Sequence, residues 1–214
     1  MNLQIVKVDK NRVLKYIGET NRADVFQLID HCEKQILNVC SPKIATFKLD
    51  EIPQSLIVGE DIKKHLENCF GIYVFCLTLG TAVDVLIRKA YYTDIFEQVV
   101  LDATSSVLVE QIAENFELEL KNQFEKENIF TTLSYAPGYG DYPISLLKTY
   151  LEMVDSAKNV GVSLTDSGLM TPRKTICAVI GLSKNKVIGF RAGCENCKIK
   201  ENCNLRKGGK SCVR

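Results

Sequence analysis

The sequence predicts an α+β fold in which helices and strands do not alternate regularly. Two apolar runs rich in β-forming residues, Ile72–Leu79 and Ile176–Leu182, are typical of buried strands. Between them, a long stretch from Thr93 to about Lys126 has apolar residues at helical spacing. Because the elements are not arranged as successive βαβ units, we expect an α+β arrangement rather than a doubly wound sheet.

Shorter periodic segments complete the expected set of elements. Thr93 and Asp94 are suitable capping residues for the long helix. The other predicted helices are Ala23–Asn38, Glu60–Glu67, Thr81–Arg88 and Tyr142–Lys158, and the other predicted strands are Leu3–Val8 and Ile44–Leu49.

Composition and charge exclude several classes of protein. The chain has 214 residues, of which 46% are hydrophobic and 25% charged, as in an ordinary globular protein. The net charge of +1 argues against broad electrostatic capture of nucleic acid or of a membrane surface. The start of the chain has no apolar region typical of a signal peptide, and no apolar run is long enough to span a membrane, so we expect a cytoplasmic protein.

The segment Tyr135–Pro143 (YAPGYGDYP) is the strongest interruption of the periodic pattern. Two prolines, two glycines and three tyrosines fall within nine residues. Glycines allow a backbone to approach a ligand closely, and tyrosine offers a flat apolar face with a polar tip. The same residue types also form ordinary turns before a helix, so this segment is either a ligand-binding loop or a helix-entry turn.

One face of the long predicted helix carries small residues around a carboxylate. Ala103, Ser106, Glu110 and Ala113 are spaced by three and four residues. This face either lets another group approach Glu110 or packs closely against a neighbouring helix.

Four stretches together resemble the reactivation domain of cobalamin-dependent methionine synthase, and more closely its short free-standing homologues from anaerobic bacteria. The stretches are TLGTAVDVLIRKA (Thr78–Ala90), LVEQIAENF (Leu108–Phe116), YAPGYGDYPIS (Tyr135–Ser145) and VGVSLTDSGLMTPRKTICAVIGL (Val160–Leu182). They occur in family order and span about half of the chain. For residues 1–190 the resemblance implies an activation domain-like fold, with helices around a twisted antiparallel sheet.

The resemblance also implies a function. Domains of this family bind S-adenosylmethionine and present it to cob(II)alamin held on a partner, so that reduction and methyl transfer restore methylcobalamin. We therefore expect an accessory subunit that reactivates a cobalamin-binding methionine synthase subunit, together with an electron-donor protein. No residue of the chain is assigned as catalytic, because the reacting cobalt belongs to the partner.

Matching the motifs residue by residue implies contacts for the ligand. Tyr139 falls on the family's tyrosine near the corrin and the ligand. Ala136 and Gly138 fall on loop backbone that hydrogen-bonds the ligand, and Glu110 on an acidic residue that receives its ammonium group.

The sequence departs from the family at Ser134, where the family has an arginine for the ligand carboxylate. A serine offers one neutral hydroxyl in place of a two-pronged cation, so binding should be weaker unless another cation compensates. Arg173 and Lys174 are the candidates, although both also suit a solvated strand entry. The segment Leu164–Met170 either lines the same groove, or its residues Asp166 and Ser167 cap a helix.

The last part of the chain, residues 191–214, forms a separate cysteine-rich tail. Cys194, Cys197, Cys203 and Cys212 have the spacing of a four-thiolate metal site, which suits structural zinc or an iron–sulfur cluster. The tail has seven Lys or Arg and two Glu, a local net charge of +5. The alternative is a reduced, basic tail that binds no metal.

Two other functions remain open at this point. The chain is either the reactivating subunit described above or a non-catalytic partner that docks on a corrinoid protein, which the serine at position 134 favours. A metal-knuckle adaptor for nucleic acid is a third reading, supported by the tail alone. The two histidines, His31 and His65, have no second histidine at ligand spacing and are expected to be structural or on the surface.

Overall fold

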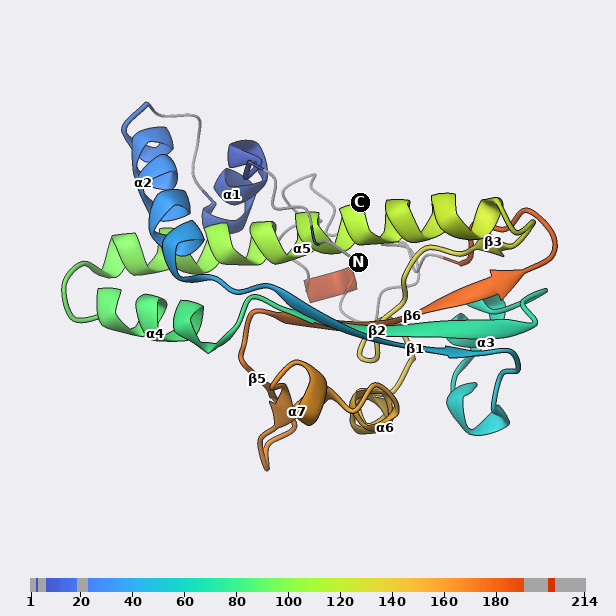
Figure 1. Cartoon of the computed structure of the whole chain (residues 1–214). Coiled ribbons are helices and arrows are strands. Elements are labelled where there is room, and N and C mark those ends of the chain that lie inside the picture. The colour runs from blue at the N-terminus through green and yellow to red at the C-terminus, as the bar shows by residue number, and fades with distance from the viewer. Residues whose placement is uncertain (1–2, 4–6, 19–22, 191–199, 203–214) are drawn as a thin grey trace. The chain divides into compact units, whose positions relative to one another are not determined.

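The computed structural model describes residues 3, 7–18, 23–190 and 200–202 (Figure 1). The chain divides into two compact units, each built from three separate stretches of sequence. The first unit comprises Met1–Thr46, Phe75–Leu120 and Leu151–Ile176, and the second comprises Phe47–Val74, Lys121–Tyr150 and Cys177–Arg214.

Helices and strands both occur along the whole described chain. The α-helices are α1 (Lys10–Ile17), α2 (Ala23–Val39), α3 (Glu60–His65), α4 (Thr81–Ala90), α5 (Ile95–Glu125), α6 (Leu146–Met153) and α7 (Ser156–Asn159). The strands are β1 (Lys43–Leu49), β2 (Gly71–Thr78), β3 (Phe130–Thr131), β4 (Ser163–Leu164), β5 (Met170–Thr171) and β6 (Thr175–Ser183). Short 3₁₀ turns occupy Gln54–Leu56 and Lys200–Asn202.

Four strands form one sheet in the order β1-β2-β6-β3, and β4 and β5 form a separate antiparallel pair. Strand β3 runs antiparallel to β6, with Phe130 opposite Ser183 and Thr131 opposite Leu182. The central strands β2 and β6 are buried at almost every position, which explains why both read as continuous apolar runs. The predicted α+β class and these two predicted strands are confirmed.

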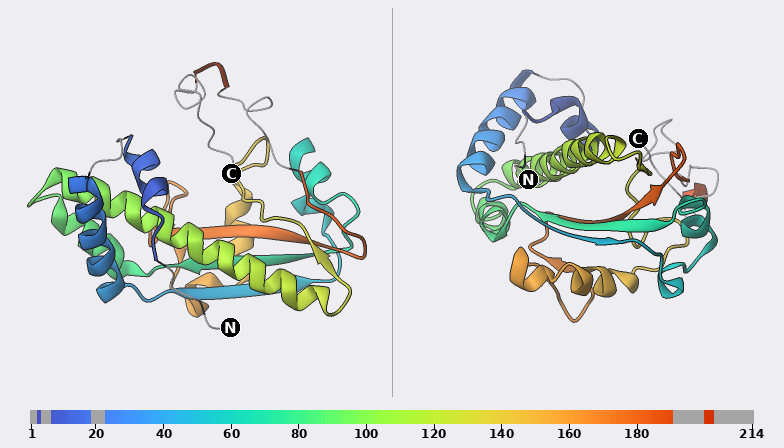
Figure 2. Two further views of the ribbon diagram at one scale, coloured as in Figure 1. Left: turned by 90° about the horizontal axis from the view of Figure 1, so that it is seen from above. Right: turned by 45° about the vertical axis from the view of Figure 1, so that its right-hand side comes forward.

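Helices of the first unit lie around the N-terminal half of α5. Figures 1 and 2 show α1 and α2 against this part of α5. Helix α5 begins where it was predicted to begin, because the Asp94 carboxylate accepts hydrogen bonds from the amides of Phe96 (2.8 Å) and Glu97 (3.1 Å). Its inward positions Leu101, Leu108 and Ile112 are fully or almost fully buried.

Two expected elements differ from the structure. The helix predicted for Tyr142–Lys158 is two helices, α6 and α7, and the first begins only at Leu146. The loop continues through Tyr142 because the carbonyl of this residue accepts a hydrogen bond from the Gly138 amide (2.9 Å). The helical pattern breaks again at Asp155, whose φ of 46° is left-handed.

The predicted strand Leu3–Val8 is not found in the positions that the structure describes. Leu3, Lys7 and Val8 lie in no strand, and the other positions lie outside the described residues. Asp9 instead caps α1, a helix that the periodicity did not predict, by accepting from the amides of Asn11 and Arg12.

A membrane-spanning helix is not found in the described part of the chain, because no helix there combines enough length with enough hydrophobicity.

Candidate functional site

The loop 135–143, which we call the tyrosine loop, begins as an extension of the sheet in the second unit. The amide of Tyr135 donates to the carbonyl of Val179 (2.8 Å), and the amide of Val179 donates back to the carbonyl of Tyr135 (2.9 Å). This isolated antiparallel bridge ties the first residue of the loop to β6. The loop therefore starts from a fixed point.

Within the loop, two glycines supply backbone conformations that other residues adopt poorly. Gly138 has φ of 98° and Gly140 has φ of 54°. The Gly138 amide donates to Tyr142, and the Tyr139 amide donates to the Ala136 carbonyl (3.2 Å). The turn is therefore closed by its own backbone, and the Gly138 amide is already in use.

The far side of the loop is joined to α3 by two aspartates. The Asp141 carboxylate accepts from the amides of Glu60 (2.7 Å) and Asp61 (3.1 Å), and the Asp61 carboxylate accepts from the Asp141 amide (3.2 Å). A Cβ at Gly140 would lie 2.0 Å from Asp61 Oδ2, so only glycine fits there. The helix start and the loop thus hold each other in place.

Tyr142 in the loop and Tyr150 on α6 are buried and structural. The Tyr142 hydroxyl donates to the Leu56 carbonyl (3.1 Å) and also contacts the Tyr150 hydroxyl. Burial is the largest cause that raises the pKa of Tyr142 to about 12, and it raises the pKa of Tyr150 as well. Both hydroxyls therefore stay protonated and serve as packing and hydrogen-bonding groups.

Tyr139 differs from these tyrosines because it points out of the loop. Its side chain is 67% exposed and meets Tyr135 edge to face, with ring centroids 6.4 Å apart. Tyr135 is buried, and its hydroxyl has no hydrogen-bond partner among the described residues. An exposed aromatic ring on a rigidly held loop is the feature expected of a ligand contact.

His65 connects the segment at the start of this loop to Phe190, which follows β6. Its Nδ1 lies 2.8 Å from the Phe190 carbonyl oxygen, and its Nε2 lies 2.9 Å from the Leu133 carbonyl oxygen. The ring also packs against Tyr135, with centroids 4.9 Å apart. The expectation of a structural histidine is confirmed.

The predicted ligand residue Glu110 lies on α5 in the first unit. Its carboxylate accepts from Arg12 Nη2 on α1 (2.6 Å) and from the Tyr16 hydroxyl. Arg12 also pairs with Glu114 (2.8 Å). This carboxylate therefore joins α1 to α5, and its role toward a ligand stays a prediction.

The remaining predicted contacts fall into both units. Ser134 is half-buried directly before the tyrosine loop in the second unit. Arg173 is exposed in the first unit, and its amide donates to the Asp84 carboxylate (2.8 Å). Lys174 is buried, with Nζ 2.8 Å from Asp102 Oδ1 and 2.9 Å from Ser106 Oγ. Lys174 is thus already paired, which leaves Arg173 as the freer of the two cations.

The proposed metal ligands Cys194, Cys197, Cys203 and Cys212 lie outside the described residues. Within the described ranges, no cluster of three or more His, Cys, Asp or Glu is arranged to hold a metal. The cysteines of the rest of the chain are free thiols that are buried or half-buried. The predicted tail site therefore stays a prediction.

The segment 164–170 does not begin a helix. It forms the turn between β4 and β5, in which Thr165 Oγ1 lies 2.8 Å from Ser167 Oγ and accepts from the Leu169 amide (3.1 Å). The capping interpretation of Asp166 and Ser167 is therefore wrong. Thr165, Leu169 and Met170 instead line a cavity of the first unit.

Sequence reasoning missed the residues that hold the tyrosine loop. Asp61 and Asp141 are 80 positions apart, and no spacing rule connects them. The one available signal was the acidic pair Glu60 and Asp61 at the start of a short helix, a position where acidic groups are favoured.

Comparisons with known proteins agree with this description. Residues 60–194 match the family model described as vitamin B12 dependent methionine synthase, activation domain. The chain is also similar in structure to the crystal structure of the MetH reactivation domain bound to AdoHcy, with a TM-score of 0.58 and 15% sequence identity. That alignment covers 96% of this chain and 78% of the other, and at this identity it shows the fold alone. No curated protein matches the chain.

Proposed function

Since the chain belongs to the activation domain family of vitamin B12 dependent methionine synthase, we propose that it is an accessory subunit for reductive reactivation of such an enzyme. In this role it presents S-adenosylmethionine to cob(II)alamin on a partner subunit. An electron from a donor protein reduces the partner's cob(II)alamin to cob(I)alamin, which takes the methyl group of S-adenosylmethionine and leaves S-adenosylhomocysteine. The chain's own contribution is to bind and orient the methyl donor.

The observation that carries the proposal is the exposure of Tyr139 on a loop fixed at both ends. A tyrosine ring attracts a cation over its face, so it suits the positively charged sulfur of the methyl donor. Because the loop is held by the sheet at Tyr135 and by α3 at Asp141, little conformational freedom is lost when a ligand binds. The loop thus offers a preorganised aromatic contact.

Other residues should limit the affinity of the chain for S-adenosylmethionine. Ser134 replaces the cation that the family uses for the ligand carboxylate, a loss on the order of 2 kcal/mol. The Glu110 carboxylate already binds Arg12, so it would have to be shared between the Arg12 guanidinium and the ammonium group of the ligand. We therefore expect binding weaker than in relatives that keep the arginine, with Arg173 as the candidate for partial compensation.

The test compares two exposed tyrosines. Tyr139→Ala should weaken S-adenosylmethionine binding by calorimetry about tenfold and lower reactivation of the co-purified corrinoid enzyme. Its melting temperature should stay close to that of the parent, because the side chain is mostly exposed.

Tyr92→Ala is the matched control. Tyr92 is 80% exposed and also meets a neighbouring tyrosine, Tyr91, edge to face. It should leave both binding and reactivation at the parental level. Equal losses in the two variants, or parental activity in Tyr139→Ala, would contradict the assignment of Tyr139.

The second candidate function is docking on a corrinoid protein without methyl transfer. Two observations favour it: the neutral Ser134, and the Arg12–Glu110 pair that already uses the acidic group. This function requires that the corrinoid protein co-purifies with the chain although no S-adenosylmethionine binds at millimolar concentration.

A further inference from the structure

A cavity of about 370 Å³ lies entirely within the first unit. Helix α4, the first turns of α5 and the β4–β5 hairpin with its exit form the walls. The volume falls in the range of small-molecule sites, which run from roughly 300 to 1,000 Å³. The chemistry of the walls therefore indicates what kind of molecule fits.

Two guanidinium groups from different elements line the cavity. Arg88 comes from the last turn of α4, and Arg173 directly follows the hairpin. In the described part of the chain, neither side chain forms an ion pair, whereas the third lining cation, Lys174, is neutralised by Asp102 (2.8 Å). Two unpaired guanidinium groups at one cavity favour a carboxylate, which arginine binds in a two-pronged manner.

One acidic group of the wall is incompletely bonded. Asp84 Oδ2 accepts from the Arg173 amide (2.8 Å), but Oδ1 is buried and has no hydrogen-bond partner within the described residues. A buried carboxylate oxygen without a donor is costly, and an ammonium group is a donor of the right charge. Asp84 lines the cavity, so a rotation of its side chain would bring this oxygen to an ammonium group, and the cavity then offers partners for both charges of a zwitterion.

Part of the remaining wall is apolar. Ile87, Leu169 and Met170 line the cavity together with Tyr91. Leu169 is 66% exposed and Tyr91 is 55% exposed, so two large apolar side chains stand open to solvent at this place. An apolar side chain of a ligand would cover them.

We propose that this cavity binds an α-amino acid with an apolar side chain. Arg88 and Arg173 hold its carboxylate, Asp84 receives its ammonium group, and Leu169 and Met170 contact its side chain. This inference does not rest on the proposed reactivation role. Only Arg173 is named in both, whereas Arg88, Asp84 and the apolar wall have no part in that role, and the ligand is a free amino acid.

The test is calorimetric titration of the full chain with L-methionine and with L-norleucine, which has the same length without sulfur. Both should bind. Arg88→Gln should weaken binding about tenfold or more, because a guanidinium–carboxylate bond is lost. Arg88 is exposed, so this variant should fold like the parent.

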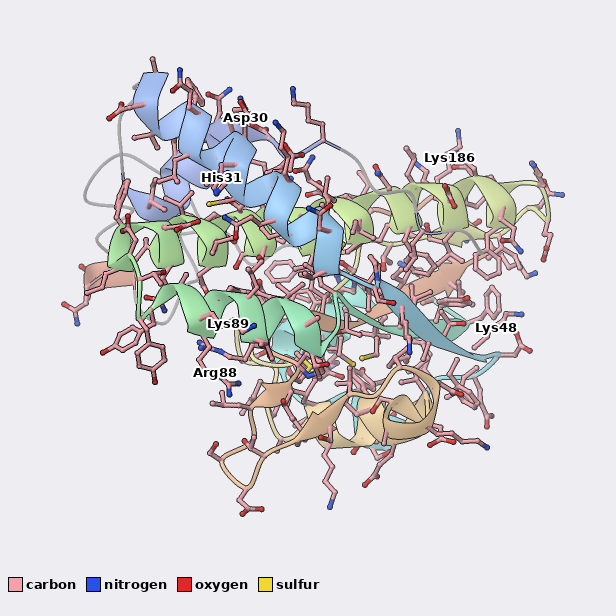
Figure 3. All side chains as sticks on the ribbon, turned by 60° about the vertical axis from the view of Figure 1, so that its left-hand side comes forward. Asp30, His31, Lys48, Arg88, Lys89 and Lys186 are labelled. Carbon is pink, nitrogen blue, oxygen red and sulfur yellow. The ribbon has the colours of Figure 1, made fainter. Side chains whose placement is uncertain are left out.

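Lys89→Gln is the matched control, because it removes the same charge from the next residue of the same helix. Figure 3 shows Arg88 and Lys89 side by side on α4, and Lys89 is not among the residues that line the cavity. Parental affinity in Lys89→Gln with loss in Arg88→Gln supports the site. Equal loss of affinity in both variants overturns it. So does the absence of binding of either amino acid at about 10 mM, a concentration well above the Kd of ordinary small-molecule sites.

Two analogues test the zwitterion without any substitution. 4-(Methylthio)butanoate lacks the ammonium group, and 3-(methylthio)propylamine lacks the carboxylate. Each should bind about tenfold or more weakly than L-methionine. Equal binding of the butanoate would overturn the role of Asp84 and reduce the cavity to a simple anion site.

Discussion

The ring of His65 joins three segments of the second unit: α3, Leu133 shortly before the tyrosine loop, and Phe190 at the end of the described region after β6. It is almost fully buried, and each ring nitrogen faces a carbonyl oxygen. Thr132 Oγ1 lies 3.0 Å from Nε2 as well. Burial lowers the pKa of His65, although its backbone hydrogen bonds act in the opposite direction.

From this lowered pKa we predict how the free energy of unfolding depends on pH. Because the unfolded chain has an ordinary histidine pKa near 6.5, it binds the proton more readily than the folded chain below that value. The contribution of His65 to the free energy of unfolding is therefore present above about pH 6.5 and is lost as the pH falls towards the folded-state pKa.

His65→Gln should consequently lose less unfolding free energy than the parent between about pH 7.5 and about pH 5.5, measured by urea denaturation at each pH. The comparison uses the difference between the two pH values, because the variant also loses hydrogen bonds at both. His31→Gln is the control, since the His31 side chain is 62% exposed. A parental pH dependence in His65→Gln would show that the ring does not titrate differently on folding.

At the scale of elements, the tyrosine loop and α3 depend on one glycine. An alanine at Gly140 would combine a left-handed φ of 54° with a Cβ that lies 2.0 Å from Asp61 Oδ2 and 2.8 Å from the Tyr135 hydroxyl. We expect Gly140→Ala to destabilise the protein by about 3 kcal/mol, of which about 1 kcal/mol is backbone strain. Urea denaturation measures the difference.

Gly168→Ala separates the two contributions. Gly168 has φ of 79°, and an added Cβ would meet nothing within 4 Å. This variant should therefore show the backbone strain alone, about 1 kcal/mol. If the two variants were equally destabilised, the contact of the added Cβ with Asp61 would contribute nothing to the loss of unfolding free energy.

Some of these elements could be predicted from the sequence and others could not. Strands β2 and β6 were predictable because burial on both faces leaves an uninterrupted apolar run, and the start of α5 because Asp94 caps locally. The end of the tyrosine loop was not, because Tyr142 has a helix-compatible pattern but is held by a hydrogen bond to Gly138. Local pattern predicts elements that follow a regular apolar spacing or a local cap, and it does not register a backbone hydrogen bond that prolongs a loop.

The candidate site also has a part that the sequence predicts and a part that it does not. The motif placed Tyr139 in a turn, and the structure finds it exposed there. The partner that occupies Glu110 could not be predicted, because Arg12 lies 98 positions away and on a helix that the periodicity did not predict. Contacts of this kind depend on packing that spacing does not encode.

For the whole molecule, the nine cysteines fall into two groups along the sequence, five in the described chain and four in the tail. Those of the described chain are buried or half-buried, and burial raises the pKa of Cys69 to about 11 and also raises that of Cys40. A thiol with a raised pKa stays protonated at neutral pH and is a poor metal ligand. Any bound metal should therefore depend on the tail cysteines and not on these.

We expect the anaerobically purified full chain to contain zinc or iron. Cys194→Ser combined with Cys197→Ser should remove two of the four thiolate ligands of the predicted site and hence the metal. Cys40→Ser combined with Cys69→Ser is the matched control and should retain it, because protonated thiols contribute no ligand. Metal analysis with a visible spectrum distinguishes the two metals, since a zinc site is colourless and an iron–sulfur cluster absorbs. A colourless zinc protein would leave the tail without a role in electron transfer, and a metal-free parent with intact thiols would eliminate the site.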